Sequence, residues 1–381
     1  MTRILYDYQA FSMQKYGGVS RCFVELSKHL PDEIESTFGV RESNNIYIRE
    51  IAGIKPENYK YDHFICKYDF WGKGHLHLWY DRLLNKGYYP DYNKNYTIEL
   101  LKKGDFDVFH PTFYDDYFLP YLGNKPFVLT VHDMIPELYP QYFPRDFDQI
   151  VLKKKLIPLA DAIVAVSENT KKDIIRIYGV PANKIHVVYH GSSLLSENSD
   201  NKFDFPYLLY VGGRWYYKNF PSFVKAIVPV LLRHNNMHIV CTGEAFNQKE
   251  LDMMKQNGVE DRFISCLVKS DSDLYSLYHH AQCFIFPSEY EGFGIPILEA
   301  YQAGCPVLLN NASCFPEIAG DAAIYFNIDS EGSNLTEQVE HLLSLSPSEK
   351  NALLSKQRSR LTKYSWDESA RRLADIYNSI C

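Results

Sequence analysis

Short apolar runs alternate with amphipathic helical patterns along the whole chain, and the runs fall into two series. Apolar runs bounded by turn residues predict buried strands, and their alternation with helical patterns predicts βα units that feed a parallel sheet. The pattern therefore predicts an α/β protein with two parallel sheets. The first series covers residues 4–8, 108–110, 127–132, 162–166 and 185–189, and the second covers residues 207–211, 238–242, 263–267, 283–287 and 306–310.

A polar segment at residues 191–206, rich in Ser, Asn and Asp, separates the two series and is typical of an interdomain linker. We expect two Rossmann-like domains whose parallel sheets face each other across a cleft. The first would cover residues 1–195 and the second residues 196–364.

Two further segments depart from the alternation. A helical pattern at residues 366–380 follows another at residues 347–362, and we expect the terminal segment, residues 365–381, to pack back on the first domain. Residues 55–96 are crowded with Tyr, His, Trp and Lys, show no clear period, and are predicted to be an insertion in the first domain.

The composition excludes several classes of protein. A length of 381 residues is too great for one ordinary core and suits two domains. A hydrophobic share of 46% and a charged share of 23% are typical of a globular chain rather than a disordered or membrane-spanning one. The net charge of -7 provides no basic field for wrapping a nucleic acid, so we expect no nucleic-acid partner.

Aromatic residues are the compositional outlier, at 15% of the chain with 30 Tyr. Amphipathic rings suit sugar stacking or a surface next to lipid, and a biased genomic composition would produce the same count. The 8 cysteines are scattered without zinc-ligand spacing and are expected to be reduced, mostly buried thiols. The N-terminus lacks a secretion signal, and no apolar stretch approaches the roughly 18 residues that span a bilayer. We expect a cytoplasmic protein and leave open a peripheral contact with the inner face of the membrane.

The segment from Glu291 to Glu299, directly after a predicted strand, is the most specific feature of the sequence. Gly292 and Gly294 permit a tight turn with exposed backbone N–H groups, and a helix starting near Pro296 would direct its positive end at an anion. A diphosphate fits that environment. Glu299 would accept hydrogen bonds from vicinal hydroxyls such as those of a ribose. The alternative is a capped helix with surface glutamates.

A second glycine turn follows the strand predicted at residues 207–211 and contains Gly213, Arg214 and Lys218. The glycine lets the backbone approach a phosphate, and the two cations would neutralise a leaving diphosphate, mainly in the transition state. An ordinary turn is the alternative at this position. The Glu291 segment strengthens the phosphate interpretation.

Gly17 and Gly18 follow the first predicted strand and open a helical pattern that runs to about Leu30. They would lie against the phosphates from the opposite wall of the cleft. A flexible loop before a helix is the alternative.

Histidines end three of the predicted strands in the first domain. His132, followed by Asp133, lies at the strand edge where α/β proteins bind ligands, so its imidazole would contact a sugar hydroxyl or the reacting centre. His110 and His190 are further candidates for contact with the sugar or acceptor, together with Asp133. A structural role is the alternative for each.

Two patterns have plainer explanations. Asp271 and Asp273 match the DxD pattern of metal-dependent sugar transferases, but they precede a helical run and are typical of an N-cap with a first-turn acid. We therefore predict no metal site. The lysines at residues 153–155, with those at 171–172, would face an anionic bilayer or simply solvate a helix, and we favour the solvated helix.

Taken together, these motifs resemble glycosyltransferase family 4 of the GT-B fold along nearly the whole chain. Residues 132–139, 160–191 and 286–326 are especially similar to bacterial members that build O-antigen or capsular chains, and Trp366 and Ala370 match the closing helix of that family. The motif residues are Gly17, Gly18, His132, Asp133, Ser167, Glu168, Gly212, Gly213, Arg214, Lys218, Asn219, Glu291 and Glu299, with Pro316, Glu317, Gly320 and Asp321 beyond them.

The resemblance implies a retaining, metal-independent hexosyltransferase of surface polysaccharide biosynthesis that uses a nucleotide sugar as co-substrate and no cofactor. The leaving phosphate oxygen would itself help to take the acceptor proton, so no separate enzymatic base is assigned. It implies catalytic roles for His132, Arg214, Lys218 and Glu291, and donor binding by Gly17, Gly18, Gly213, Val268, Phe293, Gly294, Ile295 and Glu299.

By the same resemblance, the domain at residues 1–195 would bind the acceptor and the domain at residues 196–364 the donor. GDP-mannose or a related GDP-hexose is the first expectation for the donor and a UDP-sugar the second. The acceptor would be a saccharide or an undecaprenyl-linked saccharide, and residues 55–96 lie where acceptor-binding loops vary most. Two other classes stay open. One is a nucleotide-sugar epimerase or dinucleotide oxidoreductase, although the G-x-G-x-x-G pattern is missing after the first strand. The other is a non-catalytic nucleotide-sugar-binding protein.

Overall fold

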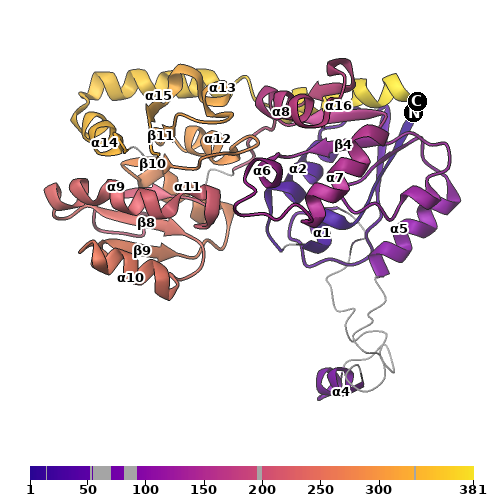
Figure 1. Ribbon diagram of the computed structural model, residues 1–381, viewed down its shortest axis with the longest axis horizontal. Helices are drawn as coiled ribbons and strands as arrows, with labels where there is room; N and C mark the ends of the chain where they lie inside the picture. The colour runs from indigo at the N-terminus through magenta and orange to yellow at the C-terminus, as the bar shows by residue number, and fades with distance from the viewer. Residues whose placement is uncertain (14, 52–53, 55–69, 81–91, 195–199, 330–331) are drawn as a thin grey trace.

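The computed structural model describes the chain apart from residues 14, 52–53, 55–69, 81–91, 195–199 and 330–331. Two α/β domains lie side by side, with the N-terminal half of the chain in one and most of the C-terminal half in the other (Figure 1). Their sheets are parallel, as the strand series predicted.

The strands of the first domain form two hydrogen-bonded groups, in the orders β2-β1-β3 and β4-β5-β6. An isolated parallel bridge between Phe109 and Phe127 joins the groups, so together they make one continuous surface. The strands are β1 (Thr2–Tyr6), β2 (Ile34–Phe38), β3 (Val108–His110), β4 (Val128–Val131), β5 (Ala162–Ala165) and β6 (Ile185–Val187).

The sheet of the second domain has the order β12-β11-β10-β7-β8-β9. Because the chain leaves β7 toward one side and later returns on the other, a topological switch point lies between β7 and β10. Open α/β sheets bind their ligands outside the carboxyl ends of strands at such points. The strands are β7 (Tyr207–Tyr210), β8 (His238–Thr242), β9 (Phe263–Cys266), β10 (Cys283–Phe286), β11 (Val307–Asn310) and β12 (Ile324–Phe326).

The central strands β4, β5, β7, β10 and β11 are buried along their whole length. Helices cover both faces of such sheets, which is why these strands have continuous apolar sequences. The predicted series missed two edge strands. In β2 only Ile34 and Phe38 are buried, and polar residues between them face outward, so no apolar run marks the strand. In β12 only Phe326 is buried.

Helices pack on both sides of each sheet. Two helices, α4 and the start of α5, lie within residues 55–96, where the sequence has no clear period; of that segment, residues 55–69 and 81–91 lie outside the described residues. The α-helices of the described residues are α1 (Gln9–Met13), α2 (Gly18–Lys28), α4 (Lys73–Tyr80), α5 (Tyr92–Lys103), α6 (Ile135–Leu138), α7 (Asp148–Leu159), α8 (Glu168–Tyr178), α9 (Phe220–Arg233), α10 (Gln248–Gln256), α11 (Asp271–His280), α12 (Ile295–Gln302), α13 (Phe315–Ala319), α14 (Leu335–Ser344), α15 (Pro347–Leu361) and α16 (Trp366–Ile380).

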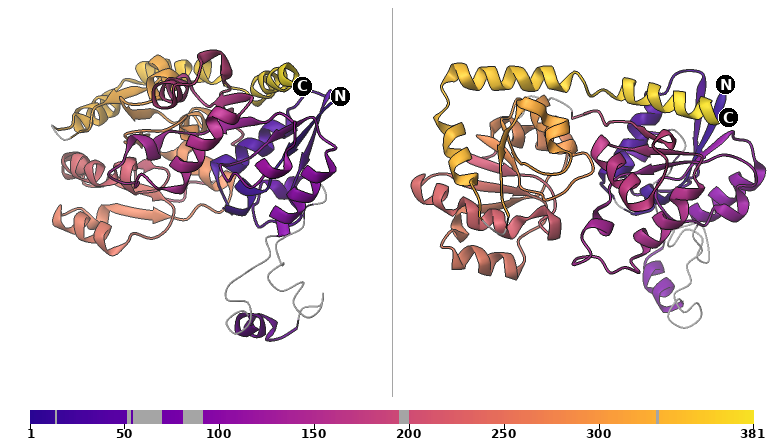
Figure 2. Two further views of the ribbon diagram at one scale, coloured as in Figure 1. Left: turned by 45° about the vertical axis from the view of Figure 1, so that its right-hand side comes forward. Right: turned by 45° about the horizontal axis from the view of Figure 1, so that its top comes forward.

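The last two helices run from one domain to the other. Figure 2 shows α15 over the second domain and α16 over the first. Helix α16 packs against α2 and buries Trp366, and the hydroxyl groups of Tyr377 and Tyr6 lie 2.8 Å apart. The chain end is therefore part of the core of the first domain.

Candidate active site

An ion pair lies at the switch point of the second sheet. The Lys218 ammonium donates to Glu291 Oε1 at 2.6 Å, and the two side chains are only 16% and 13% exposed. Lys218 ends the short 3-10 turn after β7, and Glu291 lies in the turn after β10. The structure thus brings together two of the predicted residues from separate parts of the sequence.

The turn of Glu291 is held by the segment after β11. The backbone N–H of Glu291 donates to Ser313 Oγ at 3.2 Å, and that hydroxyl donates back to the Glu291 carbonyl at 2.7 Å. The Cys314 thiol donates to the Phe293 carbonyl at 3.2 Å. Gly294, with φ of 89°, ends the turn as the N-cap of α12, a conformation that glycine adopts without strain. These contacts fix the direction in which Glu291 points.

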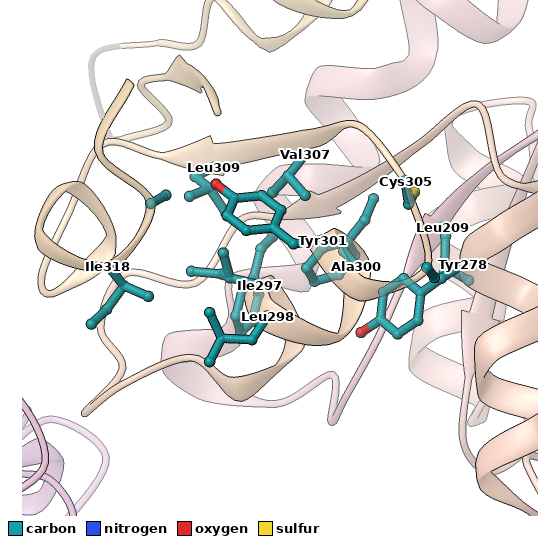
Figure 3. Close-up of a cluster of buried hydrophobic side chains, with 14 of the residues drawn as sticks. Leu209, Tyr278, Ile297, Leu298, Ala300, Tyr301, Cys305, Val307, Leu309 and Ile318 are labelled. Carbon is teal, nitrogen blue, oxygen red and sulfur yellow. The ribbon is translucent and has the colours of Figure 1, made fainter. Parts of the chain in front are cut away.

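Helix α12 is anchored by apolar side chains that face the core. Ile297, Leu298 and Tyr301 are buried in one cluster with Leu309 of β11 (Figure 3). Burying such side chains stabilises the fold by about 1.5–3 kcal/mol each. This anchoring determines the position of Glu299 on the same helix.

The Glu299 carboxylate is buried and already has partners. The Tyr278 hydroxyl donates to Oε2 at 3.2 Å, and the guanidinium of Arg21 from the first domain lies 3.6 Å from Oε1. Arg21 also donates to Asp271 at 2.8 Å. Burial raises the pKa of Glu299, and the Arg21 charge opposes that rise. The Arg21 guanidinium therefore lies next to the carboxylate predicted for the ribose, a contact that sequence reasoning missed although Arg21 closely follows Gly18.

Arg214 makes its contacts within the second domain. Its guanidinium donates to Glu250 at 2.9 Å and to the carbonyls of Glu244 and Ala245 at 2.9 and 3.1 Å. Within the described part of the chain, no contact joins it to Lys218 or Glu291. The two predicted cations thus have separate carboxylate partners, Glu291 for Lys218 and Glu250 on α10 for Arg214.

His132 faces the second domain through its backbone. A Cβ added to Gly292 would lie 1.7 Å from the His132 carbonyl oxygen, so the two turns touch across the cleft. His132 Nε2 is buried and has no hydrogen-bond partner among the described residues. Burial lowers the pKa of this imidazole to about 4, so it is neutral near pH 7. Asp133 accepts the Ile135 N–H at 2.9 Å and thereby shapes the turn.

The predicted glycines of the first domain lie opposite α12. Gly17 is the N-cap of α2, and a Cβ on Gly18 would lie 3.8 Å from Ile295 Cδ1. The structure thus brings Gly18 next to the first residue of α12. Gly213 lies in the turn after β7, beneath the ring of Trp215, and Val268 is half-buried between β9 and α11.

Two predicted contact residues, His110 and His190, lie in the core instead. Both ring nitrogens of His110 are used, by the Tyr377 hydroxyl at 2.7 Å and by a threonine hydroxyl at 2.8 Å. His190 Nδ1 lies 3.3 Å from Cys22 Sγ, and its ring is 4.9 Å from that of the buried Phe293. Both imidazoles are buried and contact other side chains of the protein, so we place no sugar contact on them.

The burial of His110 predicts a pH-dependent stability. Burial lowers its pKa from 6.5 to about 3, so the unfolded chain takes up a proton in that window while the folded chain does not. The free energy of unfolding should fall as the pH drops from 6.5 toward 3, with about 1.4 kcal/mol per pH unit from this group. Urea unfolding of wild type and His110→Gln measures the slopes, and equal slopes in this window would contradict the assignment.

Side chains that sequence reasoning left without a role connect the two domains. Ser167, the N-cap of α8, donates to the Gly292 carbonyl at 2.6 Å. The Glu317 carboxylate of the second domain accepts the backbone N–H groups of Glu168 and Asn169 at 2.7 and 3.0 Å, where the positive end of α8 favours an anion. The family resemblance was the sequence signal for these residues, because Ser167, Glu168 and Glu317 belong to the motifs on which it rests.

The contact at Gly292 predicts the effect of a single methyl group. Gly292→Ala would drive Cβ into the His132 carbonyl and should weaken the closed arrangement by about 1–3 kcal/mol, as overpacking usually does. Small-angle scattering should show a larger radius of gyration than for wild type. Gly18→Ala, which meets only a methyl at 3.8 Å, serves as the control for shape. Matching profiles for Gly292→Ala and wild type would refute the close contact.

The structure corrects part of the interpretation of two sequence patterns, the acids at residues 271 and 273 and the lysines at residues 153–155. Ser270, and not Asp271, is the N-cap of α11, and Asp273 pairs with Lys202. No group of three potential metal ligands occurs among the described residues. Of the lysines at 153–155, Lys153 is fully buried and paired with Glu137, so the solvated-helix interpretation is wrong for it.

In the part of the chain that the structure describes, no helix is long and apolar enough to cross a membrane.

Models of two protein families match the chain. "Glycosyltransferase Family 4" covers residues 16–194, and "Glycosyl transferases group 1" covers residues 195–365. The O-antigen chain mannosyltransferase RfbU of Salmonella typhimurium is 32% identical over 232 residues, 55% of this chain and 63% of that protein. The O-antigen chain mannosyltransferase B of Escherichia coli is 29% identical over 230 residues, 55% and 59% of the two chains. The matches thus span less than two thirds of each relative.

Solved structures share the architecture. A glycosyltransferase from Rickettsia africae aligns with a TM-score of 0.68 and 18% identity, over 100% of this chain and 98% of the other. HepE of Anabaena, crystallised with UDP and glucose, aligns with a TM-score of 0.71 and 15% identity over 100% of both chains. The predicted GT-B fold class is confirmed.

Proposed function

This chain belongs to glycosyltransferase family 4, and on that premise we propose that it is a retaining hexosyltransferase. It moves a hexose, mannose in the first instance, from a nucleoside-diphosphate sugar to a saccharide or lipid-linked saccharide in the cytoplasm. The product would be a surface polysaccharide such as an O-antigen. Mannose is the first choice because both relatives are O-antigen mannosyltransferases.

The Lys218–Glu291 pair supports this proposal most strongly. It lies where the turns after β7 and β10 meet, and the turn of Glu291 touches the His132 turn of the other domain through Gly292. A donor diphosphate at the switch point would take the ammonium from Glu291 and leave the carboxylate next to the sugar. An acceptor would approach from the side of His132.

The donor is tested by a thermal-shift panel of GDP, UDP, dTDP and ADP. A ligand that binds only the folded chain raises the melting temperature, by an amount that follows its concentration relative to Kd. We expect GDP to give the largest shift and UDP the next, since HepE was crystallised with UDP. Absence of any shift at millimolar nucleotide would contradict the proposal. Turnover of the matching nucleotide sugar, lost in Glu299→Ala, separates an enzyme from a binding protein.

We also predict that transfer proceeds in EDTA. Lys218 provides a positive charge at the position where a metal would otherwise neutralise the leaving diphosphate. Initial rates with and without EDTA should agree within about twofold, well below the factor of about ten that 1.4 kcal/mol represents. Complete loss of activity that Mn²⁺ restores would overturn the metal-independent assignment.

A further inference from the structure

A hollow lies beside the proposed donor site. It has a volume of about 920 Å³ and is bounded by the turn after β7, the turn after β8 and helix α10. Ligand pockets typically have about 300–1,000 Å³, so this one has room for more than a single small group. The Lys218–Glu291 pair does not line it.

Two large aromatic side chains border the hollow and stay open to solvent. Trp215 is 58% exposed and Tyr216 is 54% exposed. The Trp215 ring lies flat over the turn, because a Cβ on Gly213 would come within 2.5 Å of it. Tyr216 has φ of 47°, a left-handed conformation that costs a non-glycine residue about 1–3 kcal/mol and is concentrated at functional sites. The backbone is therefore strained at Tyr216, where the two rings are exposed.

The rings continue across the domain boundary. The Tyr216 ring is 5.1 Å from that of Tyr142 and 6.0 Å from that of Phe143, both in the first domain. Tyr142 stacks on Tyr139 at 6.0 Å, which in turn lies 6.5 Å from Tyr217, the neighbour of Lys218. A row of aromatic rings thus leads from the hollow to Tyr217, next to the Lys218–Glu291 pair.

The charges around the hollow balance. Its lining contains Arg214 and Lys249 against Glu244 and Glu250, so it favours an uncharged ligand. Arg214 and Glu250 are paired with each other, which leaves the exposed Glu244, Asn247 and Lys249 as hydrogen-bonding groups. Neutral sugars combine an apolar ring face with many hydroxyl groups, and aromatic faces next to carboxylate and amide groups suit both.

We propose that the hollow and the aromatic row bind the acceptor saccharide chain, some sugar units away from the unit that receives the hexose. This subsite rests on the proposed function and extends it, because it makes a neutral oligosaccharide the acceptor class. Trp215 and Tyr142 are its principal stacking residues, and neither contacts the reacting atoms.

The test compares wild type with Trp215→Ala and Tyr142→Ala, with Trp215→Phe as the conservative variant. Leu232→Ala, whose side chain is 67% exposed on α9 and lies outside the hollow, is the control. Binding of neutral mannose, glucose and galactose tetrasaccharides is measured by calorimetry, and binding of GDP and UDP in parallel. Loss of one stacking ring should weaken tetrasaccharide binding about three- to tenfold, and Trp215→Phe should restore part of it.

The nucleotide affinities distinguish the two proposals. Unchanged GDP or UDP binding together with weaker tetrasaccharide binding supports the subsite. Weaker nucleotide binding with unchanged saccharide binding in Trp215→Ala would assign the hollow to the donor and overturn it. So would a wild-type protein that binds nucleotide but no tetrasaccharide at millimolar concentration. Failure of wild type to bind any nucleotide would instead contradict the proposed function itself.

Discussion

Replacing Lys218 by methionine is expected to lower the turnover number of sugar transfer by about 10²–10³, the usual effect of removing one donor aimed at developing charge. The ammonium lies 2.6 Å from Glu291 Oε1 and the Lys218 side chain is only 16% exposed, so water has little access to the position that the ammonium would leave. Arg214 is paired with Glu250, so Lys218 is the cation that contacts Glu291. Steady-state kinetics with the nucleotide sugar identified by thermal shift measure the effect.

Lys225→Met is a suitable control, because Lys225 lies exposed on α9, the helix that follows this turn. It should leave kcat and KM near their wild-type values. A Lys218→Met enzyme with unchanged kcat and a raised KM would show that the lysine binds substrate and transition state equally, which would contradict the transition-state role.

Replacing Lys153 by methionine is expected to destabilise the fold by about 3–5 kcal/mol, because it leaves a buried carboxylate without its cation. The Lys153 side chain is 0% exposed, that of Glu137 is 5% exposed, and their charged atoms lie 2.8 Å apart. Lys153 also donates to the Asp133 carbonyl at 3.1 Å. The substitution therefore loosens the turn of His132 as well. Chemical denaturation measures the free energy of unfolding.

Lys154→Met provides the comparison on the same helix. Lys154 is exposed, and a surface substitution of this kind should change the free energy of unfolding by less than about 0.5 kcal/mol. The double variant Lys153→Met with Glu137→Leu should recover much of the loss, because neither charge is then left buried alone. Similar effects of Lys153→Met and Lys154→Met would refute the buried pair.

The position of Arg21 also bears on donor binding. Its guanidinium comes from the first domain and lies beside both Glu299 and Asp271 of the second, next to the carboxylate that the sequence suggested for the ribose. We expect a bound nucleotide to shift this guanidinium. Rearrangement of this kind is common in enzymes that close around their substrates.

Local sequence patterns determined most of the elements. Helix α16 spans residues 366–380, the range that its apolar period predicted, and β3 and β8 have the predicted limits. The glycines and Pro296 correctly marked the turn before α12, which begins at Ile295. These signals are local, because backbone conformation and the burial of one face depend on residues a few positions apart. The edge strands β2 and β12 escaped because they bury too few residues to leave a run.

The partners of the charged and polar side chains were decided only by the tertiary structure. Arg21 contacts Asp271, 250 positions away, and Lys153 is buried although Lys154 and Lys155, which follow it, are exposed. A side chain of this length takes the partner that folding brings within about 3–4 Å, and the energy of that contact depends on how much water the surrounding domains exclude. The spacing of residues along the chain encodes neither the partner of a charged side chain nor the energy of their contact. The sequence therefore indicated which residue types the site contains, whereas the way the two domains meet decided how those residues pair.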